Sequence, residues 1–189
     1  FEVIHEDIIN ELTQMYPLIR NLIKEDQPII EAGFKKWAEN IIANGVPHNN
    51  WNLFQADFIV KIALILQDNQ AYADGKGKQY YLDYVVNQNS IRQWSLNKLI
   101  DFGFDQKAKI WYESPGYSTT VLSTLCDFAN MLDEKAEIDM FKQRPILIDG
   151  VKASAEYLFP NRMIAGFGDT HPGYLNQGGI NNIQKYATR

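Results

Sequence analysis

Apolar residues recur at three- and four-residue steps along most of the chain, which is the period of an amphipathic α-helix. Over residues 3–24 this pattern contains Pro17, which is expected to break or kink the helix. A second helical face covers residues 26–45, where Asp26 and Pro28 suit a helix start and Asn-Gly suits a helix end. The pattern therefore predicts two helices in the first 45 residues.

The rest of the chain continues the helical pattern. Residues 51–68 are so apolar that most of the helix circumference must be buried, which predicts a central helix. Further helices are predicted at 78–101, from Ser118 or Thr119 to 136, at 145–158, and from Tyr174 onward. No segment has the alternation typical of strands, although 162–167 could be extended. The sequence predicts an all-α fold of stacked helical hairpins, with 1–189 as a single domain.

Three loops carry most of the residues suited to chemistry. They cover residues 46–51, 104–118 and 160–174 and are rich in Asn, Gly and aromatic side chains. If the hairpins are arranged around an axis, alternate loops gather at one end. These three loops are therefore expected to face a common cleft.

Charge and cysteine content exclude several classes of protein. The net charge is -5 and the basic residues form no run, so a nucleic-acid partner is not expected. The longest apolar stretch, 58–66, contains Lys61 and is far shorter than the roughly 20 residues of a membrane span. Cys126 is the only cysteine, and the spacing of the three His residues indicates no metal site, so neither a metal nor a cofactor is expected.

The first loop contains His-Asn-Asn-Trp at residues 48–51. Two consecutive Asn residues at a helix start are commonly an N-cap and its neighbour. The flanking residues favour more than a cap, because His48 can act as a base near neutral pH and Trp51 offers an apolar face for a sugar ring. An Asn amide can also donate hydrogen bonds to a carboxylate.

The other two loops combine turn residues with ionisable side chains. Trp111, Tyr112 and Glu113 precede Pro-Gly-Tyr117, which can form a simple turn that covers a helix start. The third loop reads Gly-Phe-Gly-Asp at 166–169 and is followed by His171, which Asp169 could orient.

The three loops together resemble a known family. His-Asn-Asn-Trp at 48–51, Glu-x-Pro-Gly-Tyr at 113–117 and Gly-Phe-Gly-Asp at 166–169 occur in an order similar to the heparinase II/III group of polysaccharide lyases and its alginate-lyase relatives. The resemblance implies an incomplete (α/α) toroid that cleaves uronate-containing polysaccharide by β-elimination. It also implies that 1–189 is a fragment of a larger protein, without the β-sandwich domain that usually follows, so that part of the active-site wall is missing and the isolated piece need not be active.

The expected chemistry assigns roles to these residue types. Elimination removes the C5 proton of a uronate, so the carboxylate must be neutralised while an acid protonates the leaving O4. By resemblance, Asn50, with Asn49 as the alternative, holds the carboxylate, and Tyr117 is the acid and a candidate base assisted by His48. Tyr112 is a rival to Tyr117, and Arg162 or a protonated His171 would stabilise a phenolate. The expected substrate contacts are Asn49, Trp51, Trp111, Tyr112, Glu113 and Arg162.

Two other interpretations stay open. A glycoside hydrolase on a similar toroid would need two carboxylates, drawn from Asp57, Glu113 and Asp169. A non-catalytic domain that binds glycan is the other alternative. For each, the expected partner is a polysaccharide or oligosaccharide, acidic in the case of the lyase. The size and location of such polymers lead us to expect a periplasmic or secreted protein.

Overall fold

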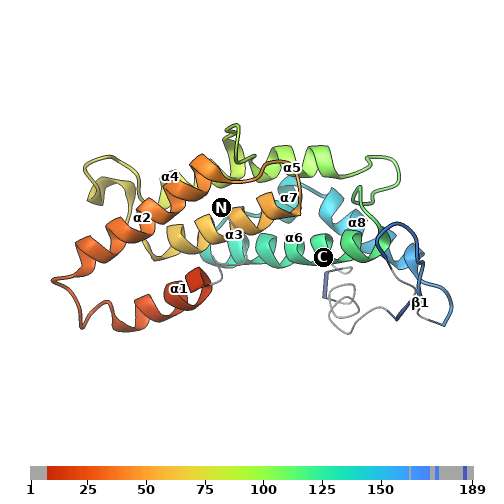
Figure 1. The fold of residues 1–189 in the computed structure, drawn as a ribbon, viewed down its shortest axis with the longest axis horizontal. Helices are drawn as coiled ribbons and strands as arrows, with labels where there is room; N and C mark the ends of the chain where they lie inside the picture. The colour runs from red at the N-terminus through yellow and green to blue at the C-terminus, as the bar shows by residue number, and fades with distance from the viewer. Residues whose placement is uncertain (1–7, 162, 171–172, 175–184, 187–189) are drawn as a thin grey trace. The chain divides into compact units, whose positions relative to one another are not determined.

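The computed structural model describes residues 8–161, 163–170, 173–174 and 185–186 and is mostly helical (Figure 1). Within these residues, strands are limited to a pair of two-residue segments, β1 (Met163–Ile164) and β2 (Gly173–Tyr174), which pair antiparallel. The prediction of an all-α fold is thus confirmed. The chain divides into two compact units, 1–102 and 103–189, and the single domain and the toroid stay predictions.

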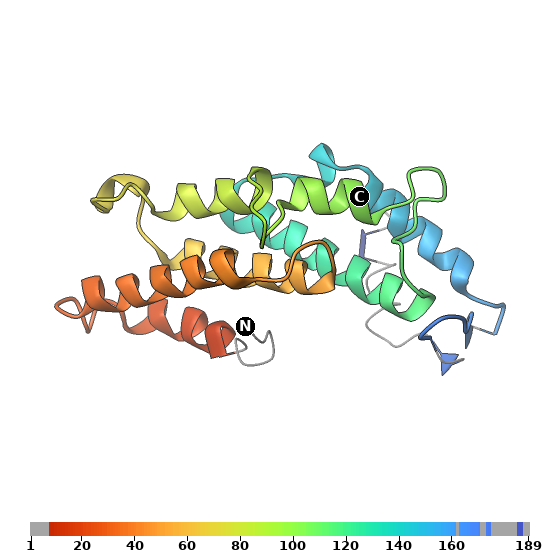
Figure 2. The same ribbon diagram turned by 45° about the horizontal axis from the view of Figure 1, so that its top comes forward.

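Five helices form the first unit, and one of them lies at its centre. They are α1 (Ile8–Ile19), α2 (Gln27–Asn44), α3 (Asn50–Ile65), α4 (Lys78–Asn87) and α5 (Leu96–Gly103), with a 3₁₀ helix at Asn69–Ala71. Helix α3 packs against α1, α2 and α4, and Figures 1 and 2 both show α2 beside it. Ten of the 16 residues of α3 are buried, which confirms the prediction of a central helix.

The prediction of one long helix at 78–101 is wrong, because α4 and α5 are separate helices. Between them, the side chain of Asn89 accepts a hydrogen bond from the Ser95 N–H, and Ser90 Oγ accepts one from the Gln93 N–H. Ser95 Oγ then accepts the Lys98 N–H, as the N-cap of α5 does. Short polar side chains that bond to nearby backbone compete with the helix here.

The turn from α2 to α3 requires Gly45 because neighbouring atoms leave no room for a side chain there. The backbone angles of Gly45 would suit other residues. A Cβ at this position would lie 2.5 Å from Gln55 Oε1 and 2.9 Å from the Arg92 carbonyl oxygen. Gln55 Oε1 also accepts the Val46 N–H at 3.1 Å. The turn is therefore packed tightly against α3 just before the His-Asn-Asn-Trp segment.

The second unit contains α6 (Pro115–Ala136), α7 (Met140–Gln143), α8 (Ile146–Ser154) and a 3₁₀ helix at Ala155–Tyr157, followed by β1 and β2. Helix α6 packs against α7 and α8. It starts at Pro115 and not at Ser118 or Thr119 as predicted, because proline suits the first helical position and Ser118 is buried. The extended segment predicted at 162–167 contains β1, whereas most of the helix predicted after Tyr174 lies outside the described residues.

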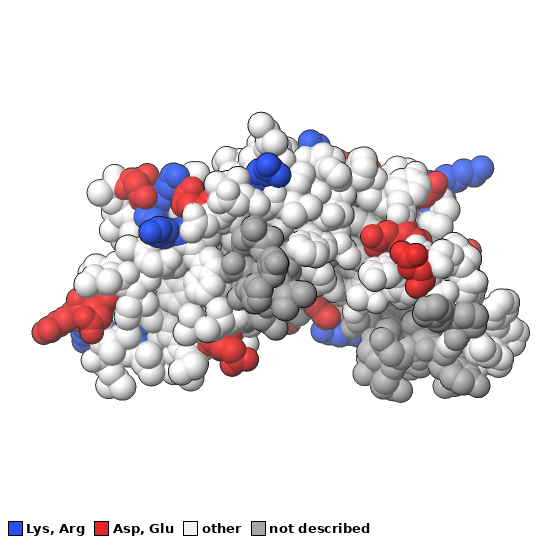
Figure 3. All heavy atoms as spheres, in the orientation of Figure 1, with Lys and Arg blue, Asp and Glu red and all other residues white. Residues whose placement is uncertain are grey.

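Charged side chains are spread over the surface in small groups of mixed sign on the face drawn in Figure 3. Within the described part of the chain, no helix has the length and apolar character needed to cross a membrane.

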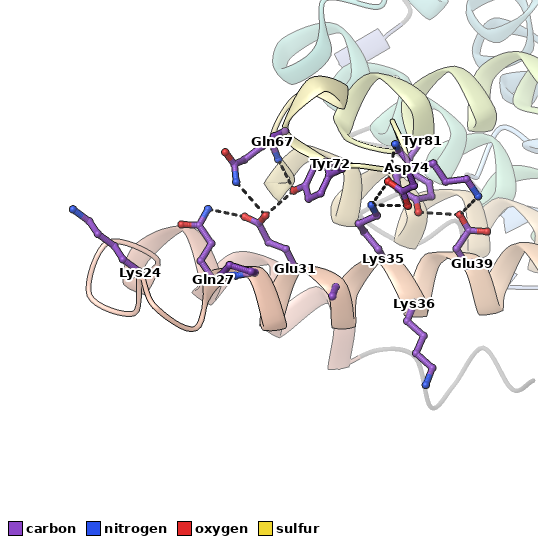
Figure 4. A pocket seen from close by; sticks show the side chains of 14 residues that line it. Lys24, Gln27, Glu31, Lys35, Lys36, Glu39, Gln67, Tyr72, Asp74 and Tyr81 are labelled. Carbon is purple, nitrogen blue, oxygen red and sulfur yellow. Dashed lines mark hydrogen bonds and ion pairs between the residues drawn. The ribbon is translucent and has the colours of Figure 1, made fainter.

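A buried carboxylate joins three segments of the first unit. Glu31 on α2 is 1% exposed and accepts hydrogen bonds at 2.7–3.3 Å from Tyr16 on α1, from Gln27, and from Gln67 and Tyr72 beyond α3. Figure 4 shows three of these donors around the carboxylate. Burial by itself would raise the pKa of Glu31, but the four donors outweigh it and hold the pKa below its usual value.

This network predicts a specific dependence of stability on pH. Because the pKa of Glu31 is lower in the folded chain, the ionised network stabilises the fold above the usual Glu pKa of about 4.3 and loses this effect as the pH falls through the folded value. Glu31→Gln should lower the free energy of unfolding at neutral pH by about 1–3 kcal/mol. It should also flatten the fall in stability between about pH 5 and pH 3.

Urea unfolding at a series of pH values measures both effects. Glu25→Gln is the matched control, because Glu25 is exposed. Equal pH slopes for the wild type and Glu31→Gln would contradict the assignment.

Candidate active site

His48 lies in an aromatic cluster at the entrance to α3. Its ring centroid is 5.1 Å from that of Trp94 and 6.2 Å from that of Phe102, and the Trp94 and Phe102 rings meet edge to face at 5.2 Å. The backbone φ of His48 is +54°, a left-handed conformation that is unfavourable for residues other than glycine. The imidazole is nevertheless exposed at one side, so it can reach a ligand.

The two Asn residues have different tasks. Asn49 is the N-cap of α3, since its Oδ1 accepts the Trp51 N–H at 3.0 Å. Asn50 begins the helix, and within the described residues its amide makes no hydrogen bond to the protein. Asn50 is therefore the one of the pair whose amide can bind a ligand, beside the partly exposed ring of Trp51.

Sequence reasoning missed Asn52, which holds this segment in place. Its buried amide donates to the Trp94 carbonyl oxygen at 3.0 Å and accepts the Trp94 N–H at 2.8 Å. The buried Gln93 adds a bond from Nε2 to the Asn52 carbonyl oxygen at 3.1 Å. These bonds fix Trp94, with Lys98 Nζ 3.8 Å from its ring centroid, next to His48. The contact spans 42 positions, so no local pattern could have revealed it.

In the second unit, the Trp111 side chain is buried and the Tyr112 side chain is exposed. Trp111 is 5% exposed and packs edge to face on Phe104, and its ring lies against Gly103, where a Cβ would clash with it. The structure therefore places Trp111 in the core, where it has little surface left for the sugar contact that was predicted. Tyr112 is 64% exposed and donates a long bond of 3.4 Å to Asp105.

Glu113 has an unusual environment for a carboxyl group. Burial raises its pKa, and the hydrogen bond with the Trp111 side chain opposes this only in part. Its Oε2 atom is buried without a hydrogen-bond partner in the described structure, and so is Ser114 Oγ. A carboxylic acid with a raised pKa can donate a proton, which suits either a general acid or a neutral hydrogen-bond donor.

The second and third loops meet within the second unit. The Gly116 N–H donates to Thr170 Oγ1 at 2.6 Å, and a Cβ on Gly168, which has a φ of +60°, would lie 3.0 Å from Ser114 Cβ. Tyr117 follows in the first turn of α6 with 48% of its surface exposed. The loops that carry Glu113 and Asp169 are therefore in contact within this unit.

Three other residues predicted for the site, Arg162, His171 and Asp57, add little to it. Arg162 and His171 lie outside the described residues. Asp57 forms an ion pair with Lys61 at 2.5 Å on the same helix, although burial raises its pKa, so its carboxylate is already engaged. Among the described residues, no group of three His, Cys, Asp or Glu side chains could hold a metal ion.

Each unit thus presents one set of polar and aromatic groups that a ligand can reach. The first offers an unengaged amide, an imidazole and an indole at the start of α3, and the second offers two exposed phenols and a carboxyl at the start of α6. That Asn50 and Tyr117 face one groove stays a prediction.

The Asn52 contact predicts a coupled loss of stability and ring packing. Asn52→Ala leaves the Trp94 N–H without its partner and the Trp94 carbonyl with only the 3.3 Å bond from Gln93 Nε2, which should lower the free energy of unfolding by about 1–3 kcal/mol. The imidazole proton shifts of His48, one of only three His residues, should move toward those of an unstructured peptide. NMR and urea unfolding measure both effects, with the exposed Asn40→Ala as control; an unchanged His48 signal would refute the coupling.

The environment of Glu113 predicts that its removal is stabilising. Because its pKa is raised in the folded chain, ionisation of Glu113 disfavours folding as the pH rises through the folded value. Glu113→Gln should raise the melting temperature at neutral pH and have little effect below the usual Glu pKa. Thermal unfolding across this range tests the sign, with the exposed Glu156→Gln as control; a lower melting temperature at neutral pH would show that the carboxylate is stabilising.

A family model provides an independent comparison. Residues 107–187, less than half of the chain, match the family described as the endo-acting ulvan lyase 2nd domain. No curated protein and no solved structure matches the chain. The second unit is therefore similar, over nearly its whole length, to a domain of a polysaccharide lyase.

Proposed function

We propose that this chain is the helical part of a secreted or periplasmic polysaccharide lyase of the heparinase II/III-like kind, which cleaves uronate-containing polysaccharide by β-elimination. The observation that carries the proposal is the family match over 107–187, because it includes the turn with Tyr117 and the loop that bonds to it through Thr170. The description of that family favours ulvan as the first polymer to test and cleavage within the polymer chain.

The proposed reaction divides between two sets of residues. The amide of Asn50 donates hydrogen bonds to the uronate carboxylate and stabilises the charge that develops when the C5 proton leaves. Tyr117 donates its phenolic proton to O4 as the C4–O4 bond breaks, which leaves a double bond between C4 and C5. If His48 accepts the C5 proton, Tyr117 starts as the phenol; if Tyr117 starts as the phenolate, it accepts the C5 proton and passes the same proton to O4.

Geometry supports two choices among the alternatives. Asn49 is already used as the α3 N-cap, which favours Asn50 as the carboxylate ligand. The Tyr112 hydroxyl has a long bond to Asp105, whereas Tyr117 stands in the first turn of α6 beside the loop of Thr170, which favours Tyr117 as the acid. Arg162 or His171 would supply the positive charge that a Tyr117 phenolate needs, while Trp51, Tyr112 and Glu113 would contact the sugar.

The first test uses substitutions that remove one reacting group each. In the intact protein, Tyr117→Phe and Asn50→Ala should each lower kcat by at least about 100-fold, the usual contribution of a positioned acid or charge stabiliser. The assay follows the ultraviolet absorbance of the unsaturated uronate. Matched controls are Tyr80→Phe and Asn44→Ala. Full activity of both site variants would refute the proposed roles, and a loss in Tyr112→Phe alone would move the acid to Tyr112.

Hydrolysis is the second candidate because the loops of Glu113 and Asp169 meet and the pKa of Glu113 is raised. A hydrolase would release reducing ends without ultraviolet-absorbing product, and Glu113→Gln would then lose activity while Tyr117→Phe kept it.

A further inference from the structure

The first unit contains a cavity, lined in part by charged and polar side chains, that the proposed reaction does not use. It has a volume of about 730 Å³ and lies between α2 and the segment that joins α3 to α4. This volume is within the roughly 300–1,000 Å³ of small-molecule sites. Its polar lining includes Gln27, Glu31, Lys35, Glu39, Gln67 and Asp74, and Figure 4 shows these side chains directed toward the space between the two segments.

The side chains that converge on the cavity are connected in pairs. Lys35 Nζ bonds to both oxygens of Asp74 at 2.7 and 2.9 Å. Lys76 Nζ and the Tyr81 hydroxyl both donate to Glu39 Oε1, at 2.9 and 3.0 Å. Glu31 is saturated by its four neutral donors. The lining is thus held in place before any ligand arrives, which reduces the entropy cost of binding.

Some hydrogen-bond donors and acceptors of these side chains remain available for a ligand. Asp74 occupies two of the three Lys35 N–H groups, and Lys35 Nζ also lies 4.2 Å from the Tyr72 ring centroid. Lys76 Nζ donates one hydrogen bond to Glu39 and lies 5.1 Å from the Tyr80 ring centroid, so at least one of its three N–H groups is left for a ligand. Within the described residues, Glu39 Oε2 has no protein donor. Ion pairs as exposed as these two contribute only about 0–1 kcal/mol to stability, so folding alone does not account for the array.

Charge decides which ligand fits. Three carboxylates, Glu31, Glu39 and Asp74, face two ammonium groups, those of Lys35 and Lys76, so the converging set has an excess of one negative charge. The other two lysines of the lining, Lys24 and Lys36, point away from the cluster in Figure 4. An acidic sugar would be repelled by the buried Glu31, whereas hydroxyl groups can both donate to carboxylates and accept from ammonium groups.

We propose that this cavity is a binding site for an uncharged sugar unit, remote from the Asn50 segment and selective against uronates. The choice of a saccharide as ligand rests on the proposed function, and the preference for a neutral unit rests on the charges of the cavity. Such a site would hold a neutral part of the polymer while an acidic unit reacts elsewhere.

NMR titration of the full chain tests the proposal without requiring catalysis. The probes are methyl glycosides of rhamnose, glucose and xylose, compared with glucuronate, each at tens of millimolar, as weak single-sugar binding requires. A neutral glycoside should shift the side-chain amide signals of Gln27 and Gln67, and glucuronate should not. Glu39→Gln should weaken the binding about fivefold, the effect of one hydrogen bond, and Lys142→Gln, an exposed lysine outside the cavity, should leave it unchanged.

Each outcome has a defined meaning. Lys76→Gln is the second variant, in case Glu39→Gln unfolds the site, and it should weaken the same shifts. No shift with any neutral glycoside, or stronger shifts with glucuronate, would overturn the proposal. Shifts by an alkylammonium ion but no sugar would show a cation site instead. Because the titration is independent of the ultraviolet assay, loss of this site and loss of the lyase assignment are distinguishable.

Discussion

The structure of the first unit depends on covering α3. This helix is apolar around most of its circumference, so it is stable in water only when neighbours bury it on several sides, and α1, α2 and α4 do so. Side chains such as Leu53, Ile59 and Ile62 are completely buried. A helix held in this way cannot rotate or slide without exposing apolar surface, so its first turn is a rigid support for the residues that precede and begin it.

The polar residues buried on α3 use this rigidity to organise the candidate site. Asn52 and Gln55 lie one turn apart near its N-terminal end, and each binds backbone or turn groups that no other residue satisfies. Buried polar side chains are costly unless they are hydrogen-bonded, so the chain must approach α3 at these points. Gly45 and Trp94 are placed by this requirement, and His48 lies between them in the chain and in contact with Trp94.

The sequence predicted the features that depend on local periodicity. The all-α class, the central helix at 51–68 and an Asn N-cap at the start of that helix follow from residues that are near one another in the sequence. It did not predict the break at 88–95, the contact of Asn52 with Trp94 or the burial of Trp111, because each depends on a partner from a distant or non-helical segment. For the candidate site, the choice of the three loops stays a prediction, and the sequence could not separate Asn49 from Asn50, since only the hydrogen bond to the Trp51 N–H does so.

Two of the loops selected from the sequence contain features that weaken the fold. His48 has a left-handed backbone, and Glu113 and Ser114 contain buried polar atoms without partners, although residues better suited to each position exist. Features that weaken a fold persist where the surrounding structure enforces them, and they occur most often where a ligand or a reaction uses them. Among the described residues, five buried side-chain atoms have no hydrogen-bond partner, and two of them, Glu113 Oε2 and Ser114 Oγ, are adjacent in the loop before Tyr117. The other three, on Gln55, Tyr84 and Gln93, lie in the first unit outside the three loops. The pair at 113–114 and the backbone of His48 therefore agree with a functional use of these loops, but unsatisfied atoms alone do not set the loops apart from the rest of the chain.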